Sequence, residues 1–236
     1  MVYSNGPSIV RDGLVLHLDA ADRNSYSGSG STWYDLSGNG NNGTFGAGTS
    51  APTFSSSNRG CIVFDGNNDY GETGQSNDLL LGTDDFTIEA FVFFNTLNSS
   101  TTILRTDSGN VYNGVLFGHQ TKLDCLITSN GTSWNVVSQS FVASGALSNT
   151  WYHLVLTRIG NNFSGYTNGS LVWTVNATGT PSIYQSNSIM RFGAANSNGA
   201  YPMNGRISNI RIYKTKGLNI EQIRQNYNAT KGRFGL

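Results

Sequence analysis

Short runs of β-branched and aromatic residues alternate with clusters of Gly, Asn, Ser and Asp along the whole chain. Runs of this kind, bounded by turn-forming residues, predict β-strands. The runs are GLVLHLDA, CIVFD, FTIEAFVFF, TILR, GVLFG, KLDCLIT, SWNVVSQSFV, WYHLVLTRI, FSGYTNG, SLVWTVN, SIMRFG and GRISNIRIY. The pattern therefore predicts an all-β protein, an antiparallel sandwich of two stacked sheets.

The run WYHLVLTRI, residues 151–159, is apolar on much of both faces. Because successive side chains of a strand point to opposite sides, Leu154 and Leu156 face one way and His153 and Val155 the other. A strand that is apolar on both sides is typical of the interior of a sheet, so we expect this one to be central.

Two local signals fix a hairpin and a helix. Asn168-Gly169 lies between two β-rich runs, and this dipeptide is the strongest short hairpin signal because both residues adopt positive φ. Near the end of the chain, Asn219 and Gln222 have the spacing of a capping box, and apolar residues recur after Asn219 at helical spacing. We expect one short C-terminal helix.

The length of 236 residues is typical of one large β-sandwich. We expect one domain over residues 13–236, preceded by an N-terminal arm over residues 1–12. Lys and Arg number 14, and so do Asp and Glu, so the formal net charge is zero. A chain with so little charge offers no basic surface to nucleic acid or to an anionic membrane, and we exclude nucleic acid as a partner.

The first residues lack a basic stretch followed by an apolar run, so the sequence predicts neither a signal peptide nor membrane insertion. Cys61 and Cys125 lie in apolar strand-like runs, without a second pair to form a disulfide framework or a metal cage. We expect buried free thiols, although a disulfide between the two stays open.

Four motifs follow one another along the chain. They are GLVLHLDA with WYDLSGNGNNGT, FDGNNDY before FTIEAFV, WYHLVLTR with YTNGSLV, and NGRISNIRIYKTKGLNIEQIRQNYNA. In this order they resemble the laminin-G-like branch of the concanavalin A-like lectin/glucanase superfamily over nearly the full length. The N-terminal GLVLHLDAADRNSYSGSGSTWYDLSGNGNNGT and the terminal NYNATKGRFG resemble, more narrowly, laminin-G-like virion proteins of tailed phages, often marine cyanophages.

The resemblance implies a jelly roll in which the first and last strands pair, so that GLVLHLD lies beside RISNIRIYK and the termini lie close together. Members of the superfamily serve as glycan-binding modules, as calcium-dependent adhesion domains, or as structural proteins on virions and cell surfaces. Fold alone does not choose among these roles.

The segment 35–41 places oxygen-bearing side chains at alternate positions, like the first half of a calcium loop, with Gly40 at the sixth position. Position twelve is Gly46, which excludes an EF-hand, whereas a looser Ca²⁺ site using Asp35, Asn39 and Asn41 stays open. Ordered turns without a metal are the favoured alternative, because Asn and Ser bond the local backbone.

Three further aspartates are candidate calcium ligands. Asp65 and Asp69 in FDGNNDY lie four residues apart around a turn, close enough to share a cation, although an Asp that accepts backbone N–H bonds is the favoured alternative. Asp107, followed by Tyr112 and Asn113, lies in a loop where the resemblance places ligands or calcium. No other cofactor is indicated.

Exposed aromatic side chains are candidates for stacking on sugar rings. Trp134 in GTSWNVV and Tyr201 in NSNGAYPMNG have polar surroundings and are the better candidates. Trp151 begins the predicted central strand and is expected in the core. Together with Tyr112 and Asn113, these two aromatic residues form the predicted ligand-binding set.

Catalysis is not expected. Retaining glucanases of this fold need two closely spaced glutamates, and Glu72, Glu89 and Glu221 are each isolated. We interpret Glu89 as a solvated or hydrogen-bonded residue on the face of a strand. The three histidines are scattered over strands without a nucleophile to orient.

The leading hypothesis is a non-catalytic structural protein on the virion surface of a tailed phage, as a capsid decoration or a tail component. It would be assembled in the host cytoplasm and would contact other virion proteins, as a monomer or a homo-oligomer. The alternative is a carbohydrate-binding adhesin, extracellular or virion-borne, that recognises cell-surface polysaccharide through its rim loops, with or without calcium.

Overall fold

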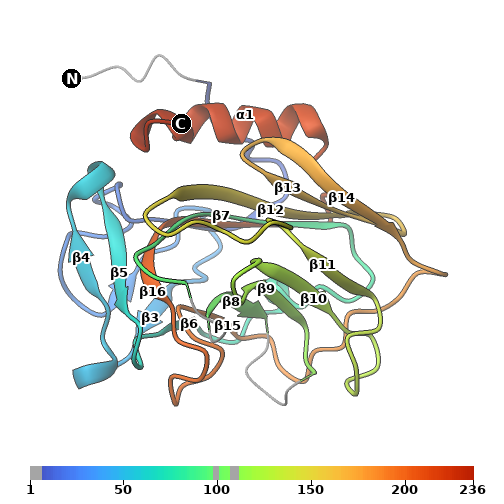
Figure 1. Ribbon diagram of the computed structural model, residues 1–236, viewed down its shortest axis with the longest axis horizontal. Coiled ribbons are helices and arrows are strands. Elements are labelled where there is room, and N and C mark those ends of the chain that lie inside the picture. The colour runs from blue at the N-terminus through green and yellow to red at the C-terminus, as the bar shows by residue number, and fades with distance from the viewer. Residues whose placement is uncertain (1–6, 98–100, 107–111) are drawn as a thin grey trace.

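Two antiparallel sheets of eight strands each lie face to face, and one helix lies on the outside of one of them (Figure 1). The structure, a computed structural model, describes residues 7–97, 101–106 and 112–236. The all-β sandwich and its single short C-terminal helix confirm the predicted fold class.

Sheet A contains the longer strands. Its order is β14 (Ser170–Asn176), β13 (Asn162–Thr167), β12 (Trp151–Ile159), β7 (Phe86–Phe94), β16 (Asn204–Lys214), β5 (Cys61–Asp65) and β4 (Thr53–Ser55), with β1 (Leu14–Asp19) also paired to β16.

Sheet B contains shorter strands. Its order is β11 (Val137–Ser140), β10 (Asp124–Ile127), β9 (Val115–His119), β8 (Thr102–Thr106), β15 (Met190–Phe192), β6 (Gly71–Thr73), β3 (Gly43–Phe45) and β2 (Thr32–Trp33). The helices are α1 (Ile220–Thr230) and four 3₁₀ turns, Gly48–Ser50, Ser57–Arg59, Asn77–Leu79 and Lys231–Arg233.

The last strand, β16, joins the two ends of the chain. One edge of β16 pairs with β7, and the other edge pairs first with β5 and then with β1. In the pairing with β1, Leu16 lies opposite Ile212 and Leu18 opposite Ile210. The pairing of first and last strands that the resemblance implied is confirmed.

The core fills the space between the sheets. Leu154 and Leu156 of β12 are fully buried there, together with Ile88 of β7 and Phe117 of β9. Each such side chain contributes about 1.5–3 kcal/mol relative to full exposure. Strand β12 lies between β7 and β13, which confirms its predicted interior position.

The predicted hairpin and helix cap are both present. Asn168 and Gly169 adopt φ of 51° and 75° and form the two-residue loop between β13 and β14. The side chain of Asn219 accepts a hydrogen bond from the backbone N–H of Gln222, and the Gln222 side chain accepts one from the N–H of Asn219. No helix in the described ranges is long and apolar enough to cross a membrane.

Helix α1 lies on the outer face of sheet A, and sheet B lies on the other side of the sandwich (Figure 1). Ile223 of the helix packs on Val155 and Tyr213 of the sheet. Ile9 and Val10, from the segment predicted to be an arm, pack in the same cluster. The two cysteines are buried and unpaired, as expected.

Gly169→Ala should destabilise the fold more than Gly160→Ala. Both glycines have positive φ in a hairpin loop, so each alanine costs about 1 kcal/mol of conformational strain. At Gly169 a Cβ would also lie 3.0 Å from the Tyr227 ring of α1, whereas at Gly160 nothing lies within 4 Å. Urea denaturation of the two variants measures the difference, and equal losses would contradict contact between this hairpin and the helix.

Candidate functional site

The outer face of sheet B carries a cavity of about 310 Å³. Side chains alternate along its strands, so that Phe117 and Cys125 enter the core while Leu116 and Leu126 face outward. Leu116 of β9 lies opposite Leu126 of β10 on one side and opposite Arg105 of β8 on the other. These three side chains belong to adjacent strands and form part of the cavity lining.

Two aromatic side chains from different loops line this cavity. Trp134 comes from the loop between β10 and β11, and Tyr201 from the loop between β15 and β16. Tyr201 is 47% exposed, and its backbone has a φ of 53°, in the left-handed region that non-glycine residues rarely occupy. The structure thus brings together the two residues that the sequence singled out for sugar stacking.

The loop that presents Tyr201 is held by its own hydrogen bonds. The side-chain oxygen of Asn196 accepts bonds from the backbone N–H groups of Asn198 and Ala200. The N–H of Ala195 donates to the carbonyl of Ala200 at 2.7 Å and closes the loop. This local order sets the position of the ring before any ligand arrives.

Tyr112 supports Trp134 rather than lining the cavity. Its ring lies edge-on to Trp134, with 5.4 Å between centroids and 64° between planes. Asn113 is only 1% exposed, and its amide donates to Ser186 at 3.4 Å. Of the four predicted ligand-binding residues, the structure therefore brings two into the pocket, places a third beside it, and leaves Asn113 buried behind them.

His119 and Asp124 supply hydrogen-bond acceptors to the pocket. Nδ1 of His119 lies 2.9 Å from the carbonyl oxygen of Thr101. Since a carbonyl only accepts, Nδ1 carries the hydrogen and Nε2 keeps its lone pair. Burial lowers the pKa of His119 below its usual range, which favours the neutral ring. The carboxylate of Asp124 accepts one bond, from the hydroxyl of Ser140 at 2.6 Å.

Arg105, His119, Asp124 and Asn196 were not identified from the sequence. The alternation in LDCLI does place Asp124 and Leu126 on the face opposite Cys125, and this is the signal that was available. The alternation cannot show that β8, β9 and β10 are neighbours or that the loop at 193–203 closes over them.

The candidate calcium loop is an ordered turn. Oδ1 of Asp35 accepts bonds from the backbone N–H groups of His17 and Ser37, at 2.8 and 2.9 Å. Oδ2 accepts from the Ser37 hydroxyl and from the N–H of Asn41, at 2.7 and 3.0 Å. Asn39 and Asn41 direct their amide groups at backbone carbonyls of β1. All four acceptor positions of the carboxylate thus face protein donors.

Asp65 and Asp69 also bond the backbone of their own turn. Oδ2 of Asp69 accepts from the N–H of Asp65 at 2.9 Å, and Oδ1 of Asp65 accepts from the N–H of Asn67 at 2.8 Å. Burial acts to raise the pKa of Asp65, but these N–H donors outweigh it and leave the pKa lowered, whereas burial raises the pKa of Asp69.

Asp107 lies outside the described residues. Within the described ranges, no three His, Cys, Asp or Glu side chains gather to hold a metal ion. The calcium site stays a prediction.

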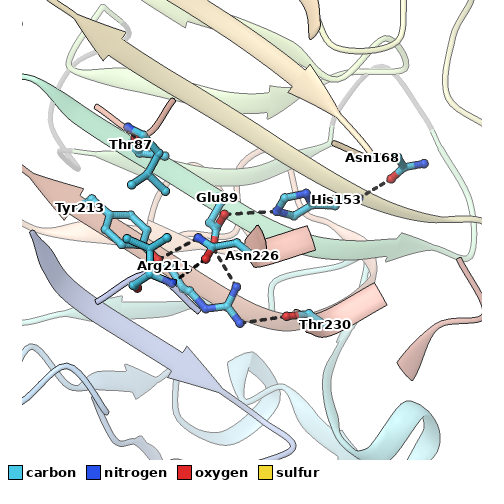
Figure 2. A network of polar contacts seen from close by, with 10 residues as sticks. Thr87, Glu89, His153, Asn168, Arg211, Tyr213, Asn226 and Thr230 are labelled. Atoms are coloured by element: carbon cyan, nitrogen blue, oxygen red, sulfur yellow. Dashed lines mark hydrogen bonds and ion pairs between the residues drawn. The ribbon is translucent and has the colours of Figure 1, made fainter. Parts of the chain in front are cut away.

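A second polar cluster lies between sheet A and helix α1 (Figure 2). Glu89 of β7 is fully buried there. Arg211 of β16 donates to its Oε1 at 2.7 Å, and Asn226 of α1 donates to the same oxygen at 3.0 Å. Nε2 of His153 lies 3.3 Å from Oε2. Two strands and the helix thus meet at one carboxylate.

The cluster extends to the N-terminal segment. The N–H of Val10 donates to the side-chain oxygen of Asn226 at 2.8 Å, and the Tyr213 hydroxyl donates to the carbonyl of Val10 at 3.0 Å. Arg211 also donates to Thr230, near the end of α1, at 3.3 Å. The network fastens both ends of the chain to sheet A.

The sequence predicted that Glu89 is either solvated or hydrogen-bonded. The structure shows that it is hydrogen-bonded and not solvated. Burial alone would raise the pKa of Glu89, but the charge of Arg211 and the bonds from His153 and Arg211 lower it to about 2. A charged carboxylate that is fully covered by protein stabilises the packing of the helix and is inaccessible to a substrate.

Comparison with known proteins places the chain among carbohydrate-related folds. The family model described as the concanavalin A-like lectin/glucanases superfamily (Laminin_G_3) matches residues 65–224. A search of curated protein sequences finds no match.

Solved structures with the same fold include binding domains of toxins. The binding domain of Paraclostridial Mosquitocidal Protein 1 is 17% identical, with a TM-score of 0.69 over 93% of this chain. Botulinum neurotoxin type C, whose cell entry depends on two ganglioside molecules, is 16% identical, with a TM-score of 0.66 over 94% of this chain. The chain spans 52% of each of these two structures.

Domain 4 of AbnA, an extracellular arabinanase from Geobacillus stearothermophilus solved with arabinotriose, matches along almost all of its length. It is 17% identical, with a TM-score of 0.66 over 91% of this chain and 98% of that domain. At these identities the likeness shows the fold alone.

Glu89→Gln should reduce the free energy of unfolding by about 3–5 kcal/mol at pH 7, because it leaves Arg211 buried without a counter-charge. The folded-state pKa of Glu89, about 2, is below its ordinary value of 4.5. Its stabilising effect is therefore present above about pH 4.5 and is lost as the pH falls toward 2, and the variant should lack this loss. Urea denaturation across this pH range measures both effects.

Glu72→Gln is the matched control. Glu72 pairs with Arg191 in sheet B, and its side chain is 32% exposed. A partly exposed pair contributes less than about 1 kcal/mol. If Glu89→Gln lowers the free energy of unfolding by no more than Glu72→Gln does, the buried network does not stabilise the packing of the helix.

Proposed function

The chain belongs to the concanavalin A-like lectin/glucanases superfamily, and we propose that it is a non-catalytic glycan-binding module whose binding site is the pocket on sheet B. The observation that carries this proposal is the pair Trp134 and Tyr201, which line one cavity together with polar side chains. Aromatic faces stack on the apolar faces of sugar rings, and flanking polar groups bond the hydroxyls.

Other features of the pocket support this role. Its volume of about 310 Å³ lies at the lower end of the range for small-molecule sites and fits one or two sugar units of a longer chain. Trp134 is held by Tyr112, and Tyr201 by a loop with its own hydrogen bonds, so binding pays little to order them.

The comparisons support the same class of ligand. The matched AbnA domain was solved with arabinotriose, and the matched neurotoxin depends on gangliosides for cell entry. We propose a cell-surface polysaccharide as the partner of this chain.

The proposal does not include catalysis. The three glutamates have separate surroundings: Glu89 is buried under the helix, Glu72 pairs with Arg191, and Glu221 lies in the first turn of α1. None of the three lines the pocket, and among the described residues Asp124 is the one carboxylate that does. A glycosidase of the two-carboxylate type would need a second.

Trp134→Ala and Tyr201→Ala should each weaken glycan binding about fivefold or more, because truncating a central aromatic residue at a binding site costs more than about 1 kcal/mol. A glycan array identifies the ligand, and titration calorimetry measures the loss. Tyr34→Ala is the control, because Tyr34 is similarly exposed at 54% but lies outside the pocket.

A purified protein that binds no glycan on the array would refute the proposal, and so would two variants that bind as well as Tyr34→Ala. EDTA in the same assay tests the calcium hypothesis. We expect binding to persist, because the described residues of the pocket include a single carboxylate and Ca²⁺ sites use several oxygen ligands.

A finer proposal is that the module acts on the virion surface of a tailed phage. It is supported by the N-terminal motif GLVLHLDAADRNSYSGSGSTWYDLSGNGNNGT and the terminal NYNATKGRFG, which resemble such virion proteins. A glycan-binding module on a virion would attach the particle to polysaccharide on its host. Mass spectrometry of purified particles should detect the chain, and its absence from them would refute this role without touching glycan binding.

A further inference from the structure

The pocket contains a nitrogen atom that accepts hydrogen bonds and cannot donate them. Nδ1 of His119 bonds the carbonyl of Thr101 and lies 3.1 Å from the hydroxyl of Thr102. Nε2 therefore carries no hydrogen, and no group of the described residues bonds to it. Since His119 lines the pocket, this lone pair is available to a ligand.

The carboxylate of Asp124 is a second acceptor. Oδ1 accepts the bond from Ser140, and no group in the described ranges bonds to Oδ2. In the antiparallel pairing of β9 and β10, Asp124 lies opposite His119. Two hydrogen-bond acceptors therefore lie on neighbouring strands in the pocket wall.

The formal charges of the pocket cancel. Among the described residues that line the pocket, Arg105 and Asp124 carry formal charges, and the lowered pKa of His119 favours its neutral form. Asn196 adds a donor, since its oxygen is occupied by two backbone N–H groups and its NH₂ group is left for a ligand. The pocket thus offers both donors and acceptors and no excess of positive charge.

A sugar hydroxyl fits this set, because it donates and accepts at once. It can donate to His119 Nε2 or to Asp124 Oδ2 while it accepts from Asn196. A sugar carboxylate only accepts hydrogen bonds. Its lone pairs would be repelled by both acceptors, and its negative charge by the charge of Asp124. Arg105 attracts a carboxylate, but the opposite charge of Asp124 offsets that attraction.

Resting on the glycan-binding role proposed above, we infer that the pocket selects uncharged sugar units and rejects units that carry a carboxylate, with Asp124 and His119 as the residues that determine this specificity.

The test uses an array of matched glycan pairs. Each uronic or sialic acid glycan is printed beside the same glycan with its carboxyl group reduced to a primary alcohol, together with neutral oligosaccharides. We expect the reduced member of a recognised pair to bind about tenfold or more tightly than the acid. Equal or tighter binding of the acid would overturn the inference. Binding to no glycan at all would instead refute the proposed function.

Asp124→Asn assigns the selection to the pocket. The variant removes the negative charge and adds a donor, so the ratio of the affinity for the acidic member to the affinity for its reduced partner should rise about tenfold. Asp12→Asn changes the net charge equally at a side chain that is 75% exposed and lies outside the pocket, and should leave the selection unchanged. If the two variants behave alike, Asp124 does not determine specificity.

Trp134→Ala on the same array shows whether the discrimination arises at this pocket. Binding of the neutral members should fall about fivefold or more. Selective binding that survives this change would occur elsewhere on the molecule and would overturn the assignment. Thermal unfolding of each variant confirms that the compared proteins are folded.

Discussion

A charged carboxylate buried inside the molecule constrains where the helix and the N-terminal segment pack on sheet A. Glu89 has no access to water, so its charge is tolerable only while Arg211, His153 and Asn226 surround it. Asn226 comes from the helix and itself bonds the segment at Val10. The helix and the segment at Val10 therefore complete the hydrogen bonds around this carboxylate, and the part of sheet A that lies under the helix is not available to a ligand.

The two sheets divide their tasks as a result. Sheet A carries the long strands, joins the first strand to the last, and is covered by helix α1 on part of its outer face. Sheet B packs one face on the core and turns the other outward, where Leu116 and Leu126 form part of a pocket rather than a contact with a helix. The proposed binding residues come from the strands of sheet B and from two loops that those strands position, as is common for sites built on a rigid scaffold.

The sequence predicted what local rules determine. Alternation identified β12 as an interior strand, positive φ at Asn168 and Gly169 fixed a hairpin, and the cap at Asn219 started the helix. The polar surroundings of Trp134 and Tyr201 marked them as candidates for stacking. These features depend on neighbours within a few residues, and a single sequence contains that information.

The rest depends on distant residues. That Glu89 is buried beneath α1 follows from the placement of Asn226 more than a hundred residues later, and no strand pattern indicates it. That His119 and Asp124 face the same pocket follows from the pairing of β9 with β10. At Asp35 a local motif was ambiguous. The sequence around it is compatible with a cation loop, and only the structure shows its oxygens bonded to backbone N–H groups.

The pairing of β1 with β16 also decides how the molecule can be tethered. The first and last strands are neighbours in sheet A, and residues 8–10 lie against helix α1, on the side of the sandwich away from sheet B (Figure 1). The pocket on sheet B thus lies on the opposite side of the sandwich from residues 8–10 and the helix. A domain with this layout can be attached to a larger assembly on its helix side and still expose its pocket to solvent.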